Sequence, residues 1–178
     1  MSIVEEIRKN LNNGVFSCGV FIDLEKAFDT VNHKILLSKL EHYGIRDTSL
    51  TWIESYLSNR KQSVKLNRVN SKYEQVSCGV PQGSILGPLL FIIYVNDMHV
   101  AVQSSIMHHF ADDTNIIFSA KNPNKIAKTL NRDLLFEWLC ANRLSLNASK
   151  TEFIVFRPPK KTLDKRIVLN RTLLFDFK

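Results

Sequence analysis

The sequence predicts an α+β domain with a small, mainly antiparallel sheet and helices packed on one face. Its length of 178 residues fits one domain, and its hydrophobic fraction of 44% is ordinary for a globular chain. Helical and strand-like segments are mixed along the chain, without the regular strand–helix alternation of a parallel sheet. Two strand-like runs between residues 106 and 118 follow each other closely enough to form a hairpin, which is an antiparallel unit.

Three helices and one buried strand are expected in the N-terminal third. In each helix apolar residues recur at three- or four-residue spacing, and Gly14 and Gly44 end the first two helices. The third helix follows a cluster of capping residues at positions 47–49. The helices are expected at residues 3–11, 31–43 and 50–57, and the strand at residues 15–24.

A hairpin, a loop and a buried helix are expected in the centre of the chain. Residues 64–66 alternate apolar and polar side chains, and they would pair with residues 73–76 across a turn at residues 70–71. The next segment is rich in glycine and proline, and an entirely apolar helix begins after it near Pro88. The loop covers residues 78–87 and the helix residues 89–95.

The C-terminal third is expected to complete the sheet. The segment from Ile106 to Phe118 would form two short strands with polar residues between them, and a helix would follow from Asn122 to Trp138. Two more short strands and a basic tail are expected at residues 144–146, 153–156 and 157–178.

Composition and charge exclude several classes of protein. The net charge of +7 is compatible with nucleic acid or an anionic membrane and selects neither. No run of about 18 apolar residues exists, which rules out a transmembrane helix, and no membrane partner is expected. The N-terminus lacks the apolar run of a secretory signal. Cys18, Cys78 and Cys140 are too widely spaced for a zinc site or a disulfide framework, so an intracellular location, in nucleus or cytoplasm, is expected.

Two acidic sites stand where a buried sheet would favour apolar residues. Asp23 ends the apolar run of residues 18–22, and Asp112 and Asp113 lie between two apolar strands. An ionised carboxylate in such a place is costly unless it is paired or bound to a cation, and Mg²⁺ prefers hard oxygen ligands. The three acids are therefore candidate metal ligands, if a tight turn lets both members of the pair reach one site. The structural alternatives are a backbone-bonded turn and, for Asp23, a helix N-cap.

Four ordered motifs resemble those of reverse transcriptases. They are FIDLEKAFD at residues 21–29, GVPQGSILGPLLF at 79–91, FADD at 110–113 and NRLSLNASKTEF at 142–153. In this order they are similar to motifs A, B, C and D of that family, in a wording nearest to jockey-type non-LTR retrotransposons. The resemblance implies the palm of an RNA-directed DNA polymerase, with the catalytic aspartates on its antiparallel sheet.

The resemblance also implies a role for each matching residue. Asp23, Asp112 and Asp113 would be catalytic and would bind two Mg²⁺ ions, with Mn²⁺ as an alternative. Phe28 would be the steric gate that excludes a ribose 2′-hydroxyl, and Lys150 would donate a proton to the departing pyrophosphate. The other substrate-binding residues would be Gln82, Gly83, Phe110 and Ala111.

Each of these residues also has a structural alternative. Phe28 could be a core aromatic, Lys150 a solvated surface lysine, and Gln82 with Gly83 part of an ordinary turn. Two positions depart from the family pattern: Phe110 stands where tyrosine is common, and Arg143 where glycine is common. The first departure keeps the aromatic ring, whereas the second bears on the assignment of Lys150.

The expected partners are an RNA template, a DNA primer and deoxynucleoside triphosphates (dNTPs). Residues 1–178 would form a single palm domain with a core at about 14–156 and a basic tail at 157–178. The N-terminal part of the fingers and the thumb would be largely absent, so weak or undetectable polymerase activity is expected from the chain alone. The alternatives are a catalytically incompetent remnant that binds nucleic acid or a protein partner, and a small metal-dependent phosphatase or nuclease.

Overall fold

A computed structural model describes residues 3–102, 105–110, 113–130, 135–159 and 161. The chain divides into two compact units, of which the first holds residues 1–25, 97–140 and 145–178, and the second residues 26–96 and 141–144. The expected α+β class and the mainly antiparallel sheet are confirmed. None of the helices in the described ranges is long and apolar enough to cross a membrane.

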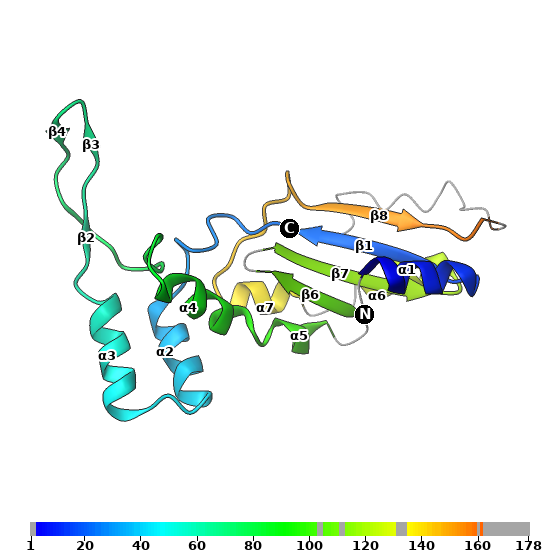
Figure 1. Cartoon of the computed structure of the whole chain (residues 1–178), viewed down its shortest axis with the longest axis horizontal. Coiled ribbons are helices and arrows are strands. Elements are labelled where there is room, and N and C mark those ends of the chain that lie inside the picture. Colours follow the sequence, from blue (N-terminus) through cyan, green and yellow to red (C-terminus); the bar gives the residue numbers. More distant parts are fainter. Residues whose placement is uncertain (1–2, 103–104, 111–112, 131–134, 160, 162–178) are drawn as a thin grey trace. The chain divides into compact units, whose positions relative to one another are not determined.

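The first unit is built on a four-stranded sheet with the strand order β6-β7-β1-β8 (Figure 1). All three pairings are antiparallel. The central strand β1 has the sequence FSCGVFI and is buried along almost its whole length, as a strand with neighbours on both sides and cover on both faces should be. The strands are β1 (Phe16–Ile22), β6 (Ile106–Phe110), β7 (Asp113–Ala120) and β8 (Glu152–Phe156).

One face of this sheet carries the apolar core of the first unit. Cys18 and Val20 on β1 lie opposite Phe118 and Ile116 on β7, and all four side chains are buried. Helix α6 (Pro123–Leu130) packs against β7 and β1 and contributes the buried Ile126. Two further helices of the unit are α5 (Met98–Ala101) and α7 (Leu135–Ala141).

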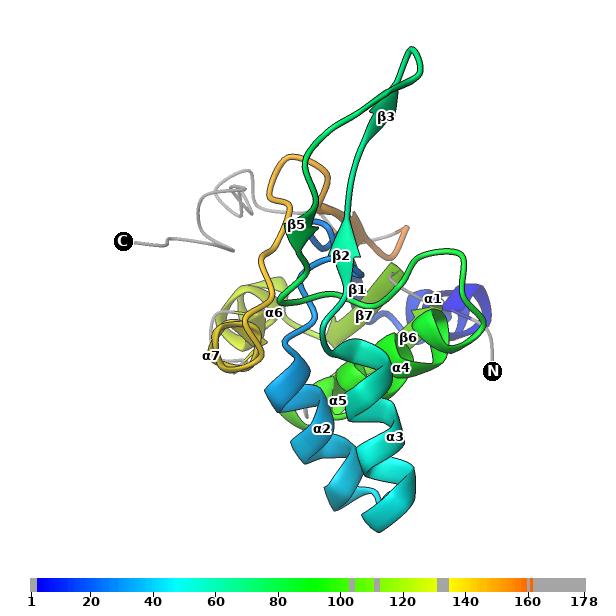
Figure 2. The same cartoon turned by 90° about the vertical axis from the view of Figure 1, so that its left-hand side faces the viewer.

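The opposite face is partly covered by α1 (Ile3–Asn12), as the views in Figures 1 and 2 show. The Asn10 side-chain amide donates to the hydroxyls of Ser17, at 3.2 Å, and Ser119, at 2.9 Å. The hydroxyls of Ser17 and Ser119 also lie 3.2 Å from each other, so the three side chains form one polar group between α1 and the sheet.

The second unit contains three helices and a long two-stranded arm (Figures 1 and 2). Helix α2 (His33–His42) begins after Asn32, whose Oδ1 accepts a hydrogen bond from the Ile35 amide at 3.1 Å. It packs against both α3 (Asp47–Leu57) and α4 (Leu86–Val95) and buries Leu36 and Leu40. Helix α4 is apolar all round and begins two positions before Pro88, so the predicted helix is confirmed. Its burial is only partial, because Leu89 and Ile92 are exposed.

The arm pairs in a register that differs from the prediction. Its pairs are β2 (Lys61–Gln62) with β5 (Glu74–Gln75) and β3 (Lys65–Leu66) with β4 (Val69–Asn70). Leu66 thus lies opposite Val69, and the turn is at Asn67 and Arg68 rather than at residues 70–71. Both turn residues have positive φ, 46° and 68°, as a tight two-residue hairpin turn requires.

The start of α3 also differs from the prediction. The helix includes the cluster at residues 47–49 instead of following it, and its N-cap residue Arg46 makes no side-chain cap bond. Asp47 itself has a φ of 52°, so the chain enters the helix through a left-handed residue. Asp tolerates that conformation better than most residues, which explains how a capping-type residue comes to lie inside the helix.

The helix expected between Asn122 and Trp138 is described in two parts, α6 and α7, and residues 131–134 between them lie outside the described ranges. One further difference lies in the C-terminal third. Residues 144–146 contribute an isolated bridge between Leu24 and Leu146 instead of a strand. Most of the expected basic tail, from residue 162 onward, also lies outside the described ranges.

Candidate active site

Two of the predicted acids lie at the same end of adjacent strands in the first unit. The last pair of the β1–β7 ladder joins Ile22 to Thr114. Asp23 directly follows Ile22, and Asp113 directly precedes Thr114 and opens β7. Because the strands are antiparallel, the end of one meets the start of the other, so both carboxylates belong to one edge of the sheet. Asp23 is half-buried and Asp113 is exposed.

The third predicted acid lies beside this edge in sequence. Phe110 on β6 pairs with Asp113 on β7, and only Ala111 and Asp112 separate these two partners. Both intervening residues lie outside the described residues, so the predictions for Ala111 and Asp112 stay predictions. Within the described part of the chain, no three His, Cys, Asp or Glu residues are grouped closely enough to hold a metal ion.

The backbone of Asp23 is fixed by the segment that carries the fourth motif. Its amide donates to the Thr151 hydroxyl at 3.3 Å, and its carbonyl accepts from the Asn147 amide at 2.9 Å. On the next residues, Leu24 bridges to Leu146. The chain on either side of the Asp23 Cα is therefore held in place while its carboxylate remains accessible to a ligand.

Lys150 lies in the turn that makes these bonds. Its amide donates to the Asn147 carbonyl at 3.2 Å, and the Ser149 hydroxyl donates to the Asn147 side-chain carbonyl at 2.6 Å. The Lys150 side chain itself is exposed. The structure thus links the turn of Lys150 to Asp23 through Asn147. Proton donation by Lys150 stays a prediction.

A buried hydroxyl lies next to the acidic edge. Thr114 is 1% exposed, and its Oγ1 lies 2.9 Å from Nδ1 of His109 on the neighbouring strand β6. The part of the His109 ring that packs against the protein loses hydration, and this lowers its pKa; the charge of His99 lowers it further. The neutral imidazole is thereby favoured beside the acids.

The predicted steric gate lies in the second unit. Phe28 is half-buried, and its ring centroid is 4.7 Å from that of Phe91 on α4, with an angle of 35° between the rings. Phe91 is 1% exposed, so it forms a fixed support. The Phe28 carbonyl also accepts a hydrogen bond from the Val80 amide at 2.8 Å. Both the core-aromatic alternative and a gate are compatible with a ring that is packed on one side and accessible on the other.

The loop that carries Gln82 and Gly83 is joined to the segment after Phe28. The Gln82 side-chain amide donates to Oδ1 of Asp29 at 2.8 Å. Gly79 donates its amide to the Val31 carbonyl at 2.8 Å. Asp29 and Gly79 were not among the predicted site residues, although each stands at the end of a motif. Their contacts could not be predicted from the sequence alone, because they form only when two segments about fifty residues apart come together in the fold.

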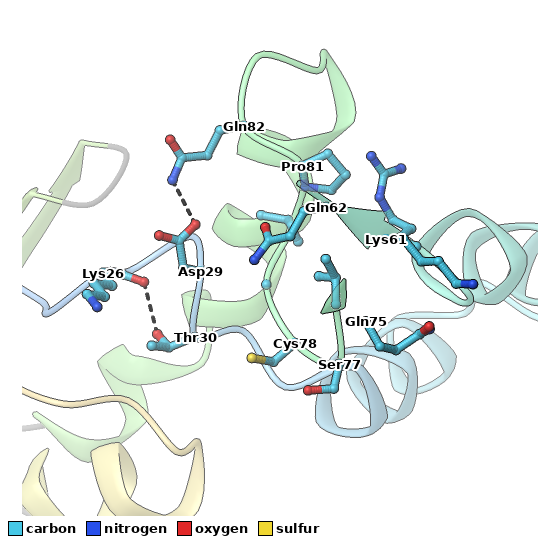
Figure 3. A pocket seen from close by; sticks show the side chains of 14 residues that line it. Lys26, Asp29, Thr30, Lys61, Gln62, Gln75, Ser77, Cys78, Pro81 and Gln82 are labelled. Atoms are coloured by element: carbon cyan, nitrogen blue, oxygen red, sulfur yellow. Dashed lines mark hydrogen bonds between the residues drawn. The ribbon is translucent and has the colours of Figure 1, made fainter. Parts of the chain in front are cut away.

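A cavity of about 630 Å³ opens beside these residues within the second unit. Figure 3 shows Lys26, Asp29 and Thr30 along one side of it, with the side chains of Gln62, Lys61 and Gln75 across from them. Basic side chains outnumber acids in the lining, which includes Lys26, Arg60 and Lys61 against the single acid Asp29. The cavity therefore favours an anionic ligand.

This fold, with acids at the ends of adjacent antiparallel strands, is that of a polymerase palm. Residues 2–168 match the family described as reverse transcriptase (RNA-dependent DNA polymerase), and the chain belongs to this family. The resemblance drawn from the four motifs is thereby confirmed.

Several curated proteins are similar over most of the chain. A probable RNA-directed DNA polymerase from transposon BS of Drosophila melanogaster is 30% identical over 164 residues, which are 84% of this chain and 17% of that protein. The RNA-directed DNA polymerase from mobile element jockey of the same species is 28% identical over 155 residues, 82% of this chain and 17% of that protein. The chain thus spans less than a fifth of the length of these relatives.

Solved structures agree on the fold. Telomerase from Candida tropicalis, in complex with a TWJ fragment of telomeric RNA, superposes with a TM-score of 0.62. The superposition covers 90% of this chain and 30% of that chain, at 16% sequence identity. At this identity the likeness supports the palm fold and nothing about substrates.

Proposed function

We propose that this chain carries the palm chemistry of an RNA-directed DNA polymerase of a non-LTR retrotransposon. The reaction would transfer a nucleotidyl group from a dNTP to the 3′-hydroxyl of a DNA primer on an RNA template. The observation that supports it most directly is the β1–β7 register, in which Asp23 and Asp113 share one edge of the sheet.

The donor set at this edge fits divalent magnesium. The two described acids offer hard carboxylate oxygens, and Asp112 would supply a third carboxylate. Asp23, Asp112 and Asp113 would hold two Mg²⁺ ions, with Mn²⁺ as the alternative. When bound, such ions lower the pKa of a coordinated hydroxyl and neutralise charge on phosphate oxygens.

The other residues would bind and orient the substrates. Phe28, supported by Phe91, would occupy the space of a 2′-hydroxyl, so that a deoxyribose fits and a ribose clashes. Lys150 would hold a proton near the departing pyrophosphate. Gln82, Gly83, Phe110 and Ala111 would also bind the substrates.

The proposal is tested by primer extension on an RNA template with Mg²⁺ and labelled dNTPs. We expect weak or undetectable extension from the wild-type chain, and any extension should be lost in Asp23→Asn and Asp112→Ala. Asp47→Asn is the matched control, because it removes one carboxylate of the second unit that has no described side-chain contact. Extension that survives Asp112→Ala would contradict the metal assignment.

The same assay separates the alternatives. RNA binding without any extension by the wild-type chain would favour the non-catalytic remnant. Cleavage of a phosphodiester in the absence of dNTPs would favour the nuclease. Robust extension by the 178-residue chain would overturn the expectation of weak activity.

A further inference from the structure

We propose that Asp29 is a positioning residue, which fixes the orientation of the Gln82 side-chain amide at the mouth of the cavity in the second unit. The inference rests on the proposed function, because it assigns the aligned amide to the nucleotide site. Its evidence is a hydrogen bond of 2.8 Å from Nε2 of Gln82 to Oδ1 of Asp29, drawn in Figure 3. Both residues line that cavity.

The backbone of Asp29 is held by hydrogen bonds and by a close approach of Gly79, while its side chain is exposed. Its amide donates to the Lys26 carbonyl at 2.8 Å, and the next residue, Thr30, donates its amide to the same carbonyl at 3.1 Å. A Cβ added at Gly79 would lie 2.8 Å from the Asp29 carbonyl oxygen and 2.9 Å from its Cα. The close approach of Gly79 therefore clamps the segment of Asp29 against the loop that leads to Gln82.

The chemistry of the two groups makes the orientation of the amide unique. An ionised carboxylate only accepts hydrogen bonds, so it must face the NH₂ end of Gln82 and never its carbonyl end. Figure 3 shows the nitrogen directed at Asp29 and the carbonyl oxygen on the other side of the amide. The Gln82 Oε1 is thereby presented as an acceptor to a donor group of a bound nucleotide, such as a sugar hydroxyl or a base N–H.

This arrangement predicts a distinct effect for the isosteric change Asp29→Asn. An asparagine keeps the shape but can donate as well as accept, so both orientations of the Gln82 amide become available. Asp29→Ala removes the partner altogether. Neither change alters the acids at the edge of the sheet in the first unit, so binding of the nucleotide should suffer and the chemical step should not.

The first experiment observes the amide directly. The side-chain NH₂ signals of Gln82 in the ¹⁵N-labelled chain are assigned by their loss in Gln82→Ala. We expect them to shift in Asp29→Asn and Asp29→Ala, and to stay unchanged in the control Asp47→Asn. Unchanged Gln82 signals in both Asp29 variants would overturn the proposal, whether or not the chain extends a primer.

The second experiment is a double-mutant cycle on dNTP binding. We expect Asp29→Ala and Gln82→Ala each to raise the KM for dNTP about three- to tenfold with kcat within about twofold, the range of one hydrogen bond. The double variant should match the single ones, because the two residues act as one unit. Asn70→Ala, an exposed amide on the arm, is the control.

The outcomes distinguish the positioning role from the proposed function. Additive effects of the two substitutions would contradict positioning while leaving the polymerase proposal intact. If no variant, including the wild type, extends a primer, dTTP is added to the wild-type chain and to Asp29→Ala, and binding is followed by the Gln82 amide signals. Loss of the dTTP-induced shift in Asp29→Ala supports positioning, and a retained shift contradicts it.

Discussion

Ile22 pairs with Thr114 at the end of the β1–β7 ladder, and each of these residues is the neighbour of an acid. Asp23 continues β1 beyond the pair, and Asp113 precedes it on β7. The antiparallel register of β1 and β7 therefore brings two carboxylates that are far apart in the sequence to one edge of the sheet. The turn of Asn147 and Thr151 then fixes the backbone of Asp23, so the acid is held by the sheet and by the fourth motif together.

The close contact of Gly79 with Asp29 can be tested by comparing Gly79→Ala with the same substitution at a glycine that has a similar φ and no neighbouring atoms. Gly79 and Gly44 have φ values of 87° and 91°, and a Cβ at Gly44 would meet nothing within 4 Å. Gly44→Ala should therefore cost about 1–2 kcal/mol of the free energy of unfolding, from backbone strain alone. Gly79→Ala should cost a further ~1–3 kcal/mol from the clash with Asp29. Equal losses in urea unfolding would show that no clamp exists.

The gate is tested by the ratio of dNTP to ribonucleotide incorporation. Phe28→Val removes the ring that packs on Phe91 and opens space beside the sugar. We expect the preference for dNTPs to fall by about tenfold or more. Tyr73→Val, which shortens an aromatic that is 70% exposed on the arm, should leave the ratio unchanged. A gate role would be excluded by the same ratio in the wild type and in Phe28→Val.

The lowered pKa of His109 predicts a pH dependence of stability. The folded state binds this proton less tightly than the unfolded chain, whose ordinary value is 6.5. Unfolding therefore takes up a proton between the lowered pKa and 6.5. The contribution of neutral His109 to the free energy of unfolding is complete above pH 6.5 and is lost as the pH falls through the lowered pKa.

Urea unfolding between about pH 5 and 8 checks this expectation. His109→Gln can keep a hydrogen bond to Thr114 but cannot titrate, so its unfolding free energy should fall less steeply on acidification. The same slope in the variant and the wild type would mean that other groups cause the pH dependence.

The three cysteines should differ sharply in reactivity. Cys18 is fully buried in β1, and burial raises the pKa of its thiol to about 12. Cys78 and Cys140 are exposed. Because the thiolate is the reactive form, iodoacetamide should label these two in the native state and Cys18 only after unfolding. Rapid addition of a third label to the native chain, read by mass spectrometry, would contradict the buried position of Cys18.

The structure confirms the predicted elements best where the sequence periodicity and the burial agree. The apolar run that became β1 was recognisable because a strand buried on both faces needs apolar residues at nearly every position. The apolar composition of α4 also marked a helix, but it did not show that Leu89 and Ile92 would be exposed. The predicted register of the arm was wrong for a local reason. Alternation marks a strand but does not fix its partner, and the left-handed pair Asn67 and Arg68 set the register instead.

The residues of the candidate site also fall into those that the sequence could identify and those that only the structure reveals. Asp23 and Asp113 could be named from the motifs, and the structure gives them a common edge. Asp29 could not be given a role, because an exposed aspartate after an aromatic has no local signature. Its role depends on the side-chain amide of Gln82, which lies in a loop about fifty residues later in the sequence and contacts Asp29 only in the folded chain.

The most direct measurement is Mn²⁺ titration of the ¹⁵N-labelled chain, followed by paramagnetic broadening of backbone amide signals. The account predicts that signals of Ile22, Asp23 and Thr114 broaden first, and that this selectivity disappears when Asp23→Asn and Asp113→Asn are combined. Asp47→Asn should keep it. Broadening that is centred elsewhere, or that persists in the combined variant, would contradict a divalent-cation site at the edge of the sheet.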